Sequence, residues 1–240
     1  MGRILGVLYG IVAYAAFLVA FLYAIGFVGG LVVPKHIDSG VAPGMAEALI
    51  VNLLLLSAFA VQHSVMARPW FKAAWTRIVP ASVERSTYVL LSSLVLLLLY
   101  WQWRPMPSVM WNVADANGRM AIQGLFWLGW VIVLLSTFMI NHFDLFGLRQ
   151  VYFLWRGEAS PQLPFVTRGF YRFVRHPIMV GFIIAFWAAP TMTLGHLVFA
   201  ATTTAYILVA LQFEEHDLME MLGDAYRDYK KRVPMLIPWR

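Results

Sequence analysis

The amino-acid sequence predicts an all-α, polytopic integral membrane protein of about five transmembrane helices, with a C-terminal helical hairpin and an amphipathic tail helix. Of its 240 residues, 61% are hydrophobic and only 12% are charged. Charged residues make up about a quarter of an ordinary soluble domain. Several uncharged stretches reach the ~20 apolar residues that a helix needs to cross a bilayer. We therefore expect one membrane domain over residues 1–240.

The distribution of positive charge predicts the orientation of the chain. All but three of the 18 Lys and Arg residues lie in the N-terminus, the 67–85 loop, the 144–176 loop or the tail. Because cytoplasmic segments carry an excess of Lys and Arg, both termini are expected in the cytoplasm and the 104–118 loop outside it. This topology and contact with anionic lipid explain the net charge of +6, so the bilayer is expected as a partner and nucleic acid is not.

The first part of the chain, residues 1–143, reads as a four-helix membrane bundle. The stretch 4–33 is a retained first span that stops at Pro34, since it has no cleavage site of a secretory signal. A basic, Trp-containing segment between Pro69 and Pro80 is typical of the membrane interface. The other three expected spans are residues 45–66, 86–103 and 120–142.

The second part, residues 144–240, begins with a cytoplasmic connection and continues into two short apolar runs. The run 177–189 is too short to span the bilayer without tilt, and Pro190 and Gly195 separate it from a second run that ends at Phe213. The two runs predict a helical hairpin. Residues 214–232 repeat apolar side chains at a spacing of about 3.6 residues, which predicts an amphipathic helix.

The sequence also limits the chemistry that the chain can perform. It contains no cysteine, which excludes disulfides, Cys-ligated zinc and a cysteine nucleophile. The six histidines show no His-(x)3-His spacing, so no metal site is expected.

Polar side chains gather instead at the expected cytoplasmic ends of the helices, where they should face the bundle interior. One set is Gln62, His63 and Ser64, and another is Asn141, His142, Asp144, Arg149 and Gln150. His63, His142 or Asp144 are candidates for a general base, with Gln62, Asn141, Arg149 and Gln150 orienting a substrate. Alternatively, His63 forms a helix-to-helix hydrogen bond, the 141–144 segment caps a helix, and Arg149 only pairs with Asp144.

A third set lies in the C-terminal part, with a distinctive spacing: Arg175-His176-Pro177-(x)3-Gly181, then Glu214-Glu215, Tyr226, Tyr229 and Val233-Pro234. Over roughly residues 165–240 this pattern resembles the C-terminal module of the isoprenylcysteine carboxyl methyltransferase and phospholipid methyltransferase superfamily. The upstream segments Gln62-His63-Ser64-(x)3-Arg68 and 141–150 are similar to the branch that includes bacterial methanethiol S-methyltransferases and denitrification-associated membrane proteins.

The resemblance implies methyl transfer from S-adenosylmethionine, with His176, Pro177 and Glu214 or Glu215 lining the cofactor pocket, together with Arg175. An acidic group suits the ribose diol or the ammonium of this cofactor, and the Tyr226 and Tyr229 rings suit its cationic sulfur. Within the branch, the expected reaction is the conversion of methanethiol, a small thiol, to dimethyl sulfide in a bacterial inner membrane. No obligate protein partner is implied.

Two other functions remain open at this point. In the first, the enzyme methylates a lipid acceptor, which is an isoprenylcysteine carboxylate or a phospholipid amine. In the second, the chain is a non-catalytic denitrification-associated protein whose C-terminal motif only holds the structure together.

Overall fold

The computed structural model describes residues 2–161 and 163–238, and within them helices predominate. The all-α membrane class is confirmed, because five helices are long and apolar enough to cross a bilayer. They are α1 (Gly2–Gly29), α2 (Met45–Ala67), α4 (Ala81–Gln102), α5 (Ala116–Ile140) and α9 (Leu194–Leu222).

Shorter elements connect these helices. They are α3 (Pro69–Trp75), β1 (Val109–Asn112), α6 (His142–Leu145), α7 (Leu148–Arg156), the 3-10 turn η1 (Gly169–Arg172), α8 (Pro177–Trp187), β2 (Thr191–Thr193) and α10 (Asp224–Arg232).

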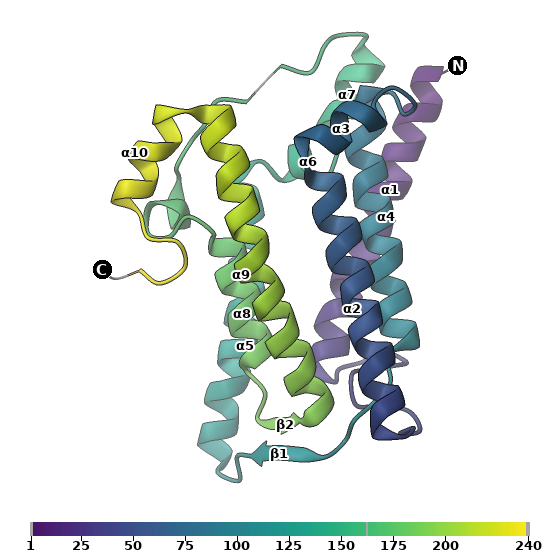
Figure 1. Cartoon of the computed structure of the whole chain (residues 1–240), viewed down its shortest axis with the longest axis vertical. Helices are drawn as coiled ribbons and strands as arrows, with labels where there is room; N and C mark the ends of the chain where they lie inside the picture. Colours follow the sequence, from purple (N-terminus) through teal and green to yellow (C-terminus); the bar gives the residue numbers. More distant parts are fainter. Residues whose placement is uncertain (1, 162, 239–240) are drawn as a thin grey trace.

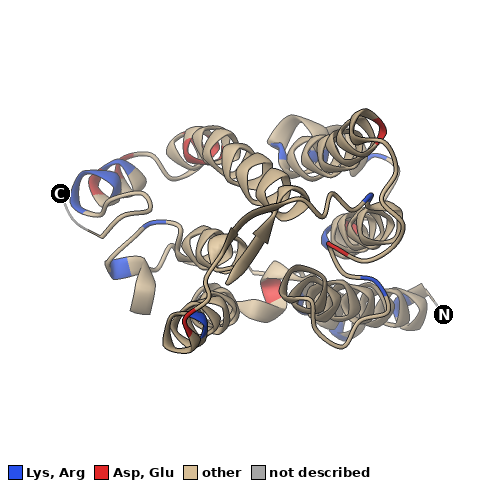
Figure 2. Ribbon diagram, turned by 90° about the horizontal axis from the view of Figure 1, so that it is seen from below, with Lys and Arg blue, Asp and Glu red and all other residues tan. Residues whose placement is uncertain are grey.

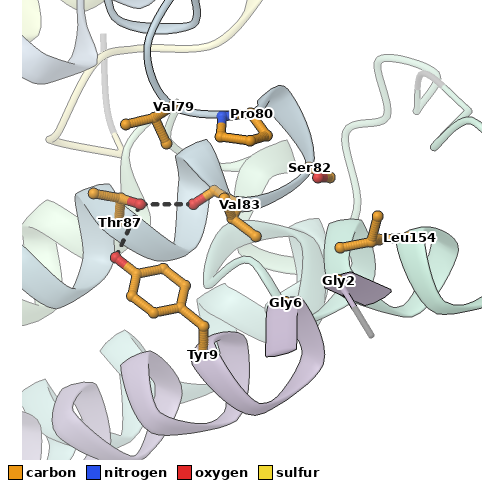
Figure 3. A pocket seen from close by; sticks show the side chains of 9 residues that line it. All are labelled: Gly2, Gly6, Tyr9, Val79, Pro80, Ser82, Val83, Thr87 and Leu154. Atoms are coloured by element: carbon orange, nitrogen blue, oxygen red, sulfur yellow. Dashed lines mark hydrogen bonds between the residues drawn. The ribbon is translucent and has the colours of Figure 1, made fainter. Parts of the chain in front are cut away.

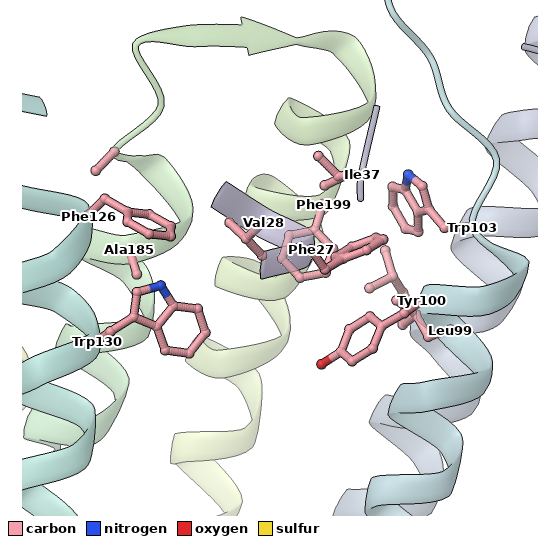
Figure 4. Close-up of a cluster of buried hydrophobic side chains, with 12 residues drawn as sticks. Phe27, Val28, Ile37, Leu99, Tyr100, Trp103, Phe126, Trp130, Ala185 and Phe199 are labelled. Atoms are coloured by element: carbon pink, nitrogen blue, oxygen red, sulfur yellow. The ribbon is translucent and has the colours of Figure 1, made fainter. Parts of the chain in front are cut away.

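The long helices form two groups that stand side by side (Figure 1). One group is α1, α2 and α4, and the other is α5, α8 and α9. Aromatic side chains fill the space where the groups meet, and Figure 4 shows the ring of Phe199 beside Phe27 and Trp103. Phe27 and Trp103 are fully buried. This burial of aromatic surface joins two groups that otherwise touch at few places.

Within the second group, α5 and α8 pack with almost no side chain between them. A Cβ atom on Gly129 would lie 2.6 Å from the backbone oxygen of Gly181, and the reverse holds for Gly181. Small residues allow membrane helices to approach this closely. The largest interface of α5 is therefore with α8, a helix of the second part of the chain. The division of the chain into residues 1–143 and 144–240 stays a prediction.

The C-terminal hairpin is present, with a link that sequence patterns did not indicate. After α8 the chain becomes extended, and β2 pairs antiparallel with β1, with Val109 opposite Thr193 and Asn112 opposite Thr191. Figure 2 views the molecule from this end and shows the strand pair lying across the bundle without Lys, Arg, Asp or Glu. The extended link adds length to α8, which has only 11 residues.

The prediction of one continuous amphipathic helix over residues 214–232 is wrong, because two helices share this segment. Helix α9 continues without a break through Glu214 and Glu215 to Leu222. Gly223 then adopts φ +57°, and α10 begins at Asp224. Glycine takes positive φ at little cost, so the chain turns here and the amphipathic part is α10 alone. The two glutamates therefore belong to the last turns of a spanning helix.

The N-terminus and α10 lie toward one end of the molecule, and β1 and β2 lie at the opposite end (Figure 1). The loop that carries β1 is therefore on the face opposite the N-terminus. Which face meets the cytoplasm remains a prediction of the charge distribution.

Candidate functional site

Four side chains form an ionic cluster at the end of α9, here called the C-terminal clasp: Arg175, His176, Glu215 and Lys230. Arg175 Nε donates to Glu215 Oε1 at 2.6 Å, and His176 Nε2 lies 3.1 Å from the same oxygen. Lys230 Nζ lies 2.8 Å from Glu215 Oε2. The side chains of Arg175 and Glu215 are only 7% and 3% exposed. One buried carboxylate thus binds three basic groups from two segments, namely helix α10 and the residues directly before α8.

Backbone hydrogen bonds complete the clasp. The N–H groups of Arg175 and His176 donate to the carbonyls of Pro234 and Met235 at 2.9 and 3.2 Å. The Arg175 guanidinium also donates to the carbonyl of Val233. Pro177 is buried directly after the clasp and begins α8, where its missing N–H costs nothing. The clasp therefore fastens the start of α8 and the segment after α10 to the end of α9.

Glu214 differs from its neighbour because it is half-exposed and takes little part in the clasp. Its side chain is 47% exposed, and Oε2 lies 4.0 Å from His176 Nδ1. Burial raises the pKa of Tyr171, and the nearby Glu214 carboxylate raises that pKa further. The Glu214 carboxylate also lies within electrostatic range of Tyr226. Glu214 therefore faces an aromatic group with a free carboxylate.

This aromatic group consists of Tyr171, Tyr226, Tyr229 and Phe165. Tyr229 donates its hydroxyl to the Tyr171 carbonyl at 2.7 Å, and burial raises the pKa of Tyr229 to about 12. Tyr226 is 2% exposed, and its hydroxyl has no hydrogen-bond partner among the residues that the structure describes. A buried polar atom of this kind normally has a partner. A half-exposed carboxylate, an unpaired phenol and aromatic faces together suit a cationic ligand that also carries hydroxyl groups.

A second cluster surrounds His63 on α2. The Tyr88 hydroxyl lies 3.0 Å from His63 Nδ1 and 2.9 Å from Nε2, and Ser92 Oγ lies 3.2 Å from Nδ1. The ring of Phe59 stacks on the imidazole at 5.1 Å. Gln62 does not join the cluster, since its side-chain amide contacts Met66. The helix-to-helix hydrogen bond that was the alternative role of His63 is therefore present, and its partners come from α4.

Two contacts connect α2 with α9 beside this cluster. The hydroxyls of Ser64 and Tyr206 are 3.0 Å apart, and Arg68 pairs with Asp217 at 2.8 Å. Tyr206 and Asp217 lie on α9, the helix that also carries Glu214. These contacts therefore join the His63 cluster to the helix that carries Glu214. Neither Tyr88 nor Tyr206 was a candidate from the sequence, because a tyrosine in an apolar helix carries no pattern that distinguishes it from packing residues.

The third set, on α6 and α7, makes most of its hydrogen bonds within itself or to its immediate neighbours, although Gln150 Oε1 is buried without a partner among the described residues. His142 is 4% exposed; Tyr14 Oη lies 2.8 Å from Nε2, and Thr137 Oγ1 lies 2.9 Å from Nδ1. Arg149 and Gln150 both donate to Asp144, at 3.0 and 3.2 Å. Asn141 caps α6 by accepting from the Asp144 N–H. Within the described residues, no hydrogen bond or ion pair connects this set with the clasp. This geometry agrees with the structural alternative for these residues.

An apolar pocket of about 450 Å³ lies between the starts of α1 and α4 and the end of α7 (Figure 3). Tyr9 donates to Thr87 at 3.0 Å on its wall. None of its lining residues belongs to the three polar sets. A second, smaller pocket of about 150 Å³ lies beside Pro177, between η1 and Leu236.

The fold defines a helical membrane protein, with five helices long and apolar enough to span a bilayer and polar clusters near their ends. The chain belongs to the NnrU protein family, whose model matches residues 51–234. It is 62% identical over 239 residues to methanethiol S-methyltransferase of Mycobacterium tuberculosis, covering 100% of this chain and 98% of that protein.

Other relatives carry the same name. Identity is 58% over 236 residues to methanethiol S-methyltransferase 2 of Bradyrhizobium diazoefficiens, covering 98% of this chain and 91% of the relative. It is 51% over 239 residues to the enzyme of Crocosphaera subtropica, covering 100% and 94%. The resemblance that the sequence motifs predicted is confirmed. No solved structure matches the chain significantly.

Proposed function

We propose that the chain is a membrane methyltransferase that converts methanethiol to dimethyl sulfide with S-adenosylmethionine as the methyl donor. The observation that carries the proposal is near-complete coverage by relatives of that name, at identities from 48% to 62%. Both termini and the site are proposed to face the cytoplasm, in keeping with the distribution of Lys and Arg.

The donor supplies a methyl group on a cationic sulfur. In this proposal Glu214 and His176 bind its polar groups, and the Tyr226 hydroxyl offers a further hydrogen bond. The half-exposed position of Glu214 and the unpaired Tyr226 hydroxyl support these roles. Glu215, Arg175 and Lys230 already bind one another, so their proposed role is to hold α10 and the following segment against the site.

Methanethiol is favoured over a lipid acceptor by the relatives that carry its name, at identities from 48% to 62% over nearly the whole chain. The apolar pockets beside Pro177 and at the starts of α1 and α4 contain no residue of the His63 cluster, and neither has an acceptor role in this proposal.

The base is proposed to belong to the His63 cluster. The contacts of Ser64 with Tyr206 and of Arg68 with Asp217 join this cluster to α9, the helix that carries Glu214, whereas no such contact joins His142 or Asp144 to α9 within the described residues. Holding thiol and methyl group in line would replace an unfavourable bimolecular encounter.

A headspace assay tests the reaction. Detergent-solubilised protein receives S-adenosylmethionine and methanethiol, and dimethyl sulfide is measured by gas chromatography. We expect dimethyl sulfide from the wild type and a strong loss in Glu214→Gln. Cofactor binding by the wild type without any dimethyl sulfide would favour a lipid acceptor, and no cofactor binding at all would favour a non-catalytic protein.

A further inference from the structure

Both ring nitrogens of His63 already have hydrogen-bond partners, so a thiol cannot donate to the imidazole directly. Ser92 occupies the side of Nδ1, and the Tyr88 hydroxyl lies within 3.0 Å of both ring nitrogens. The imidazole therefore has no nitrogen without a partner. The atom to which a thiol can donate a hydrogen bond is the Tyr88 oxygen, because a hydroxyl that donates to His63 keeps lone pairs that can accept a hydrogen bond from another group.

Tyr88 is also well placed and well held. It is 6% exposed, its ring is covered by the Arg85 guanidinium at 4.9 Å, and its oxygen points to His63. A second phenol, Tyr206 on α9, lies beside the same cluster: its hydroxyl is 3.0 Å from that of Ser64, and its ring packs against Phe59 at 6.3 Å. Phe59 also stacks on the His63 imidazole. Two hydroxyls from different helix groups thus approach the same part of α2.

We propose that the hydroxyls of Tyr88 and Tyr206 bind the acceptor thiol, and that Tyr88 passes the thiol proton to His63. This inference rests on the proposed function, since it takes methanethiol as the acceptor. Tyr88 would be the catalytic residue that touches the thiol. His63 would accept the proton through it, and Ser92 would position the imidazole.

The S–H bond breaks, its proton moves to the Tyr88 oxygen, and the Tyr88 proton moves to His63. The sulfur lone pair forms the new carbon–sulfur bond to the methyl group. The bond between that methyl group and the donor sulfur breaks, and its electron pair stays on the donor sulfur. The products are dimethyl sulfide, the neutral thioether of the donor, and a proton on His63 that later returns to solvent.

The chain contains a matched control for this role. Tyr14 also approaches a histidine nitrogen closely, at 2.8 Å from His142 Nε2. This second pair belongs to the set on α6, and no hydrogen bond or ion pair within the described residues connects it with Glu214. Tyr14→Phe therefore removes the same kind of hydrogen bond as Tyr88→Phe without touching the proposed acceptor site.

The experiment compares Tyr88→Phe and Tyr14→Phe with two acceptors, methanethiol and the more acidic 2,2,2-trifluoroethanethiol. For Tyr88→Phe we expect turnover of methanethiol to fall by about 100-fold, the size of a typical acid–base contribution. Calorimetric affinity for S-adenosylmethionine should stay within about twofold of wild type, because the interaction is made with the acceptor. The deficit should shrink to less than about 10-fold with the acidic thiol, because a much larger fraction of it is already thiolate at the same pH.

Equal deficits of Tyr88→Phe with both thiols would overturn the proton transfer, and so would wild-type turnover of methanethiol. Tyr14→Phe should retain wild-type turnover with both. If Tyr88→Phe does not fold, His63→Gln carries the same expectation of rescue by the acidic thiol. A wild type that methylates neither thiol contradicts the proposed function itself, whereas an active wild type with an unaffected Tyr88→Phe contradicts only this inference.

Discussion

Replacing Glu215 by glutamine should unfasten the C-terminal clasp. The substitution keeps the shape of the side chain and removes its charge. Arg175 would then keep a guanidinium that is 7% exposed without a carboxylate to neutralise it. Breaking one partner of a buried ion pair costs about 3–5 kcal/mol of folding free energy. Lys230 is 40% exposed and adds little to this cost, because solvent screens it.

The expected effect is large enough to measure by thermal unfolding in detergent. For a chain of 150–250 residues, each kcal/mol lowers Tm by about 2–4 °C, so Glu215→Gln should lower it by about 6–20 °C. Trypsin should also cleave faster at Lys231, since α10 loses its attachment to α9.

The adjacent Glu214→Gln is the matched control. Its side chain is 47% exposed, so its unfolding free energy should stay within about 0.5 kcal/mol of wild type. Its affinity for S-adenosylmethionine should instead fall by roughly 10-fold or more, because a hydrogen bond to a charged group is worth about 1.5–3 kcal/mol. An unchanged Tm in Glu215→Gln, or a larger loss of Tm in Glu214→Gln, would refute the assignment of the two roles.

Three further outcomes are expected. Burial lowers the pKa of His142, so its contribution to stability is present above the ordinary pKa of about 6.5 and is lost as pH falls below that value. Tm should therefore fall less steeply with acidification in His142→Gln than in the wild type, while the exposed control His216→Gln should keep the wild-type slope. A wild-type slope in His142→Gln would contradict this reasoning. Gly129→Ala should cost about 1–3 kcal/mol in a denaturation assay, because its Cβ would lie 2.6 Å from a backbone oxygen of α8, whereas Gly124→Ala, with no atom within 4 Å, should be neutral. Reporter tags at the two termini should both report the cytoplasm and a tag in the 104–118 loop the opposite side, and a cytoplasmic loop would reverse the topology.

Hydropathy and proline positions predicted the spanning helices well, because the cost of placing polar backbone and charge in lipid acts on each segment locally. The break at Gly223 was missed, although glycine is the residue expected at such a turn. The pairing of β1 with β2 joins residues about 80 positions apart, Asn112 and Thr191 among them. No local pattern predicts such a pairing, since it depends on how the helices place the two strands.

The sequence likewise predicted one part of the candidate site and missed another. The residue types at the membrane boundary and their spacing were sufficient to predict a methyltransferase-like C-terminal module around His176 and the two glutamates. They were insufficient to tell Glu214 from Glu215, because adjacent residues on a helix differ by about 100° in direction and either can face inward.

By itself, the sequence determined that this chain is a helical membrane protein whose polar chemistry lies near the ends of its spans, since composition and periodicity govern the transfer of each segment into lipid. Only the tertiary structure decided that Glu215 is buried against Arg175 while Glu214 stays half-exposed. It also placed Tyr88 against His63 and Tyr206 against Ser64. The physical reason is that these contacts depend on the rotation and approach of packed helices, which are set by side chains far apart in the chain.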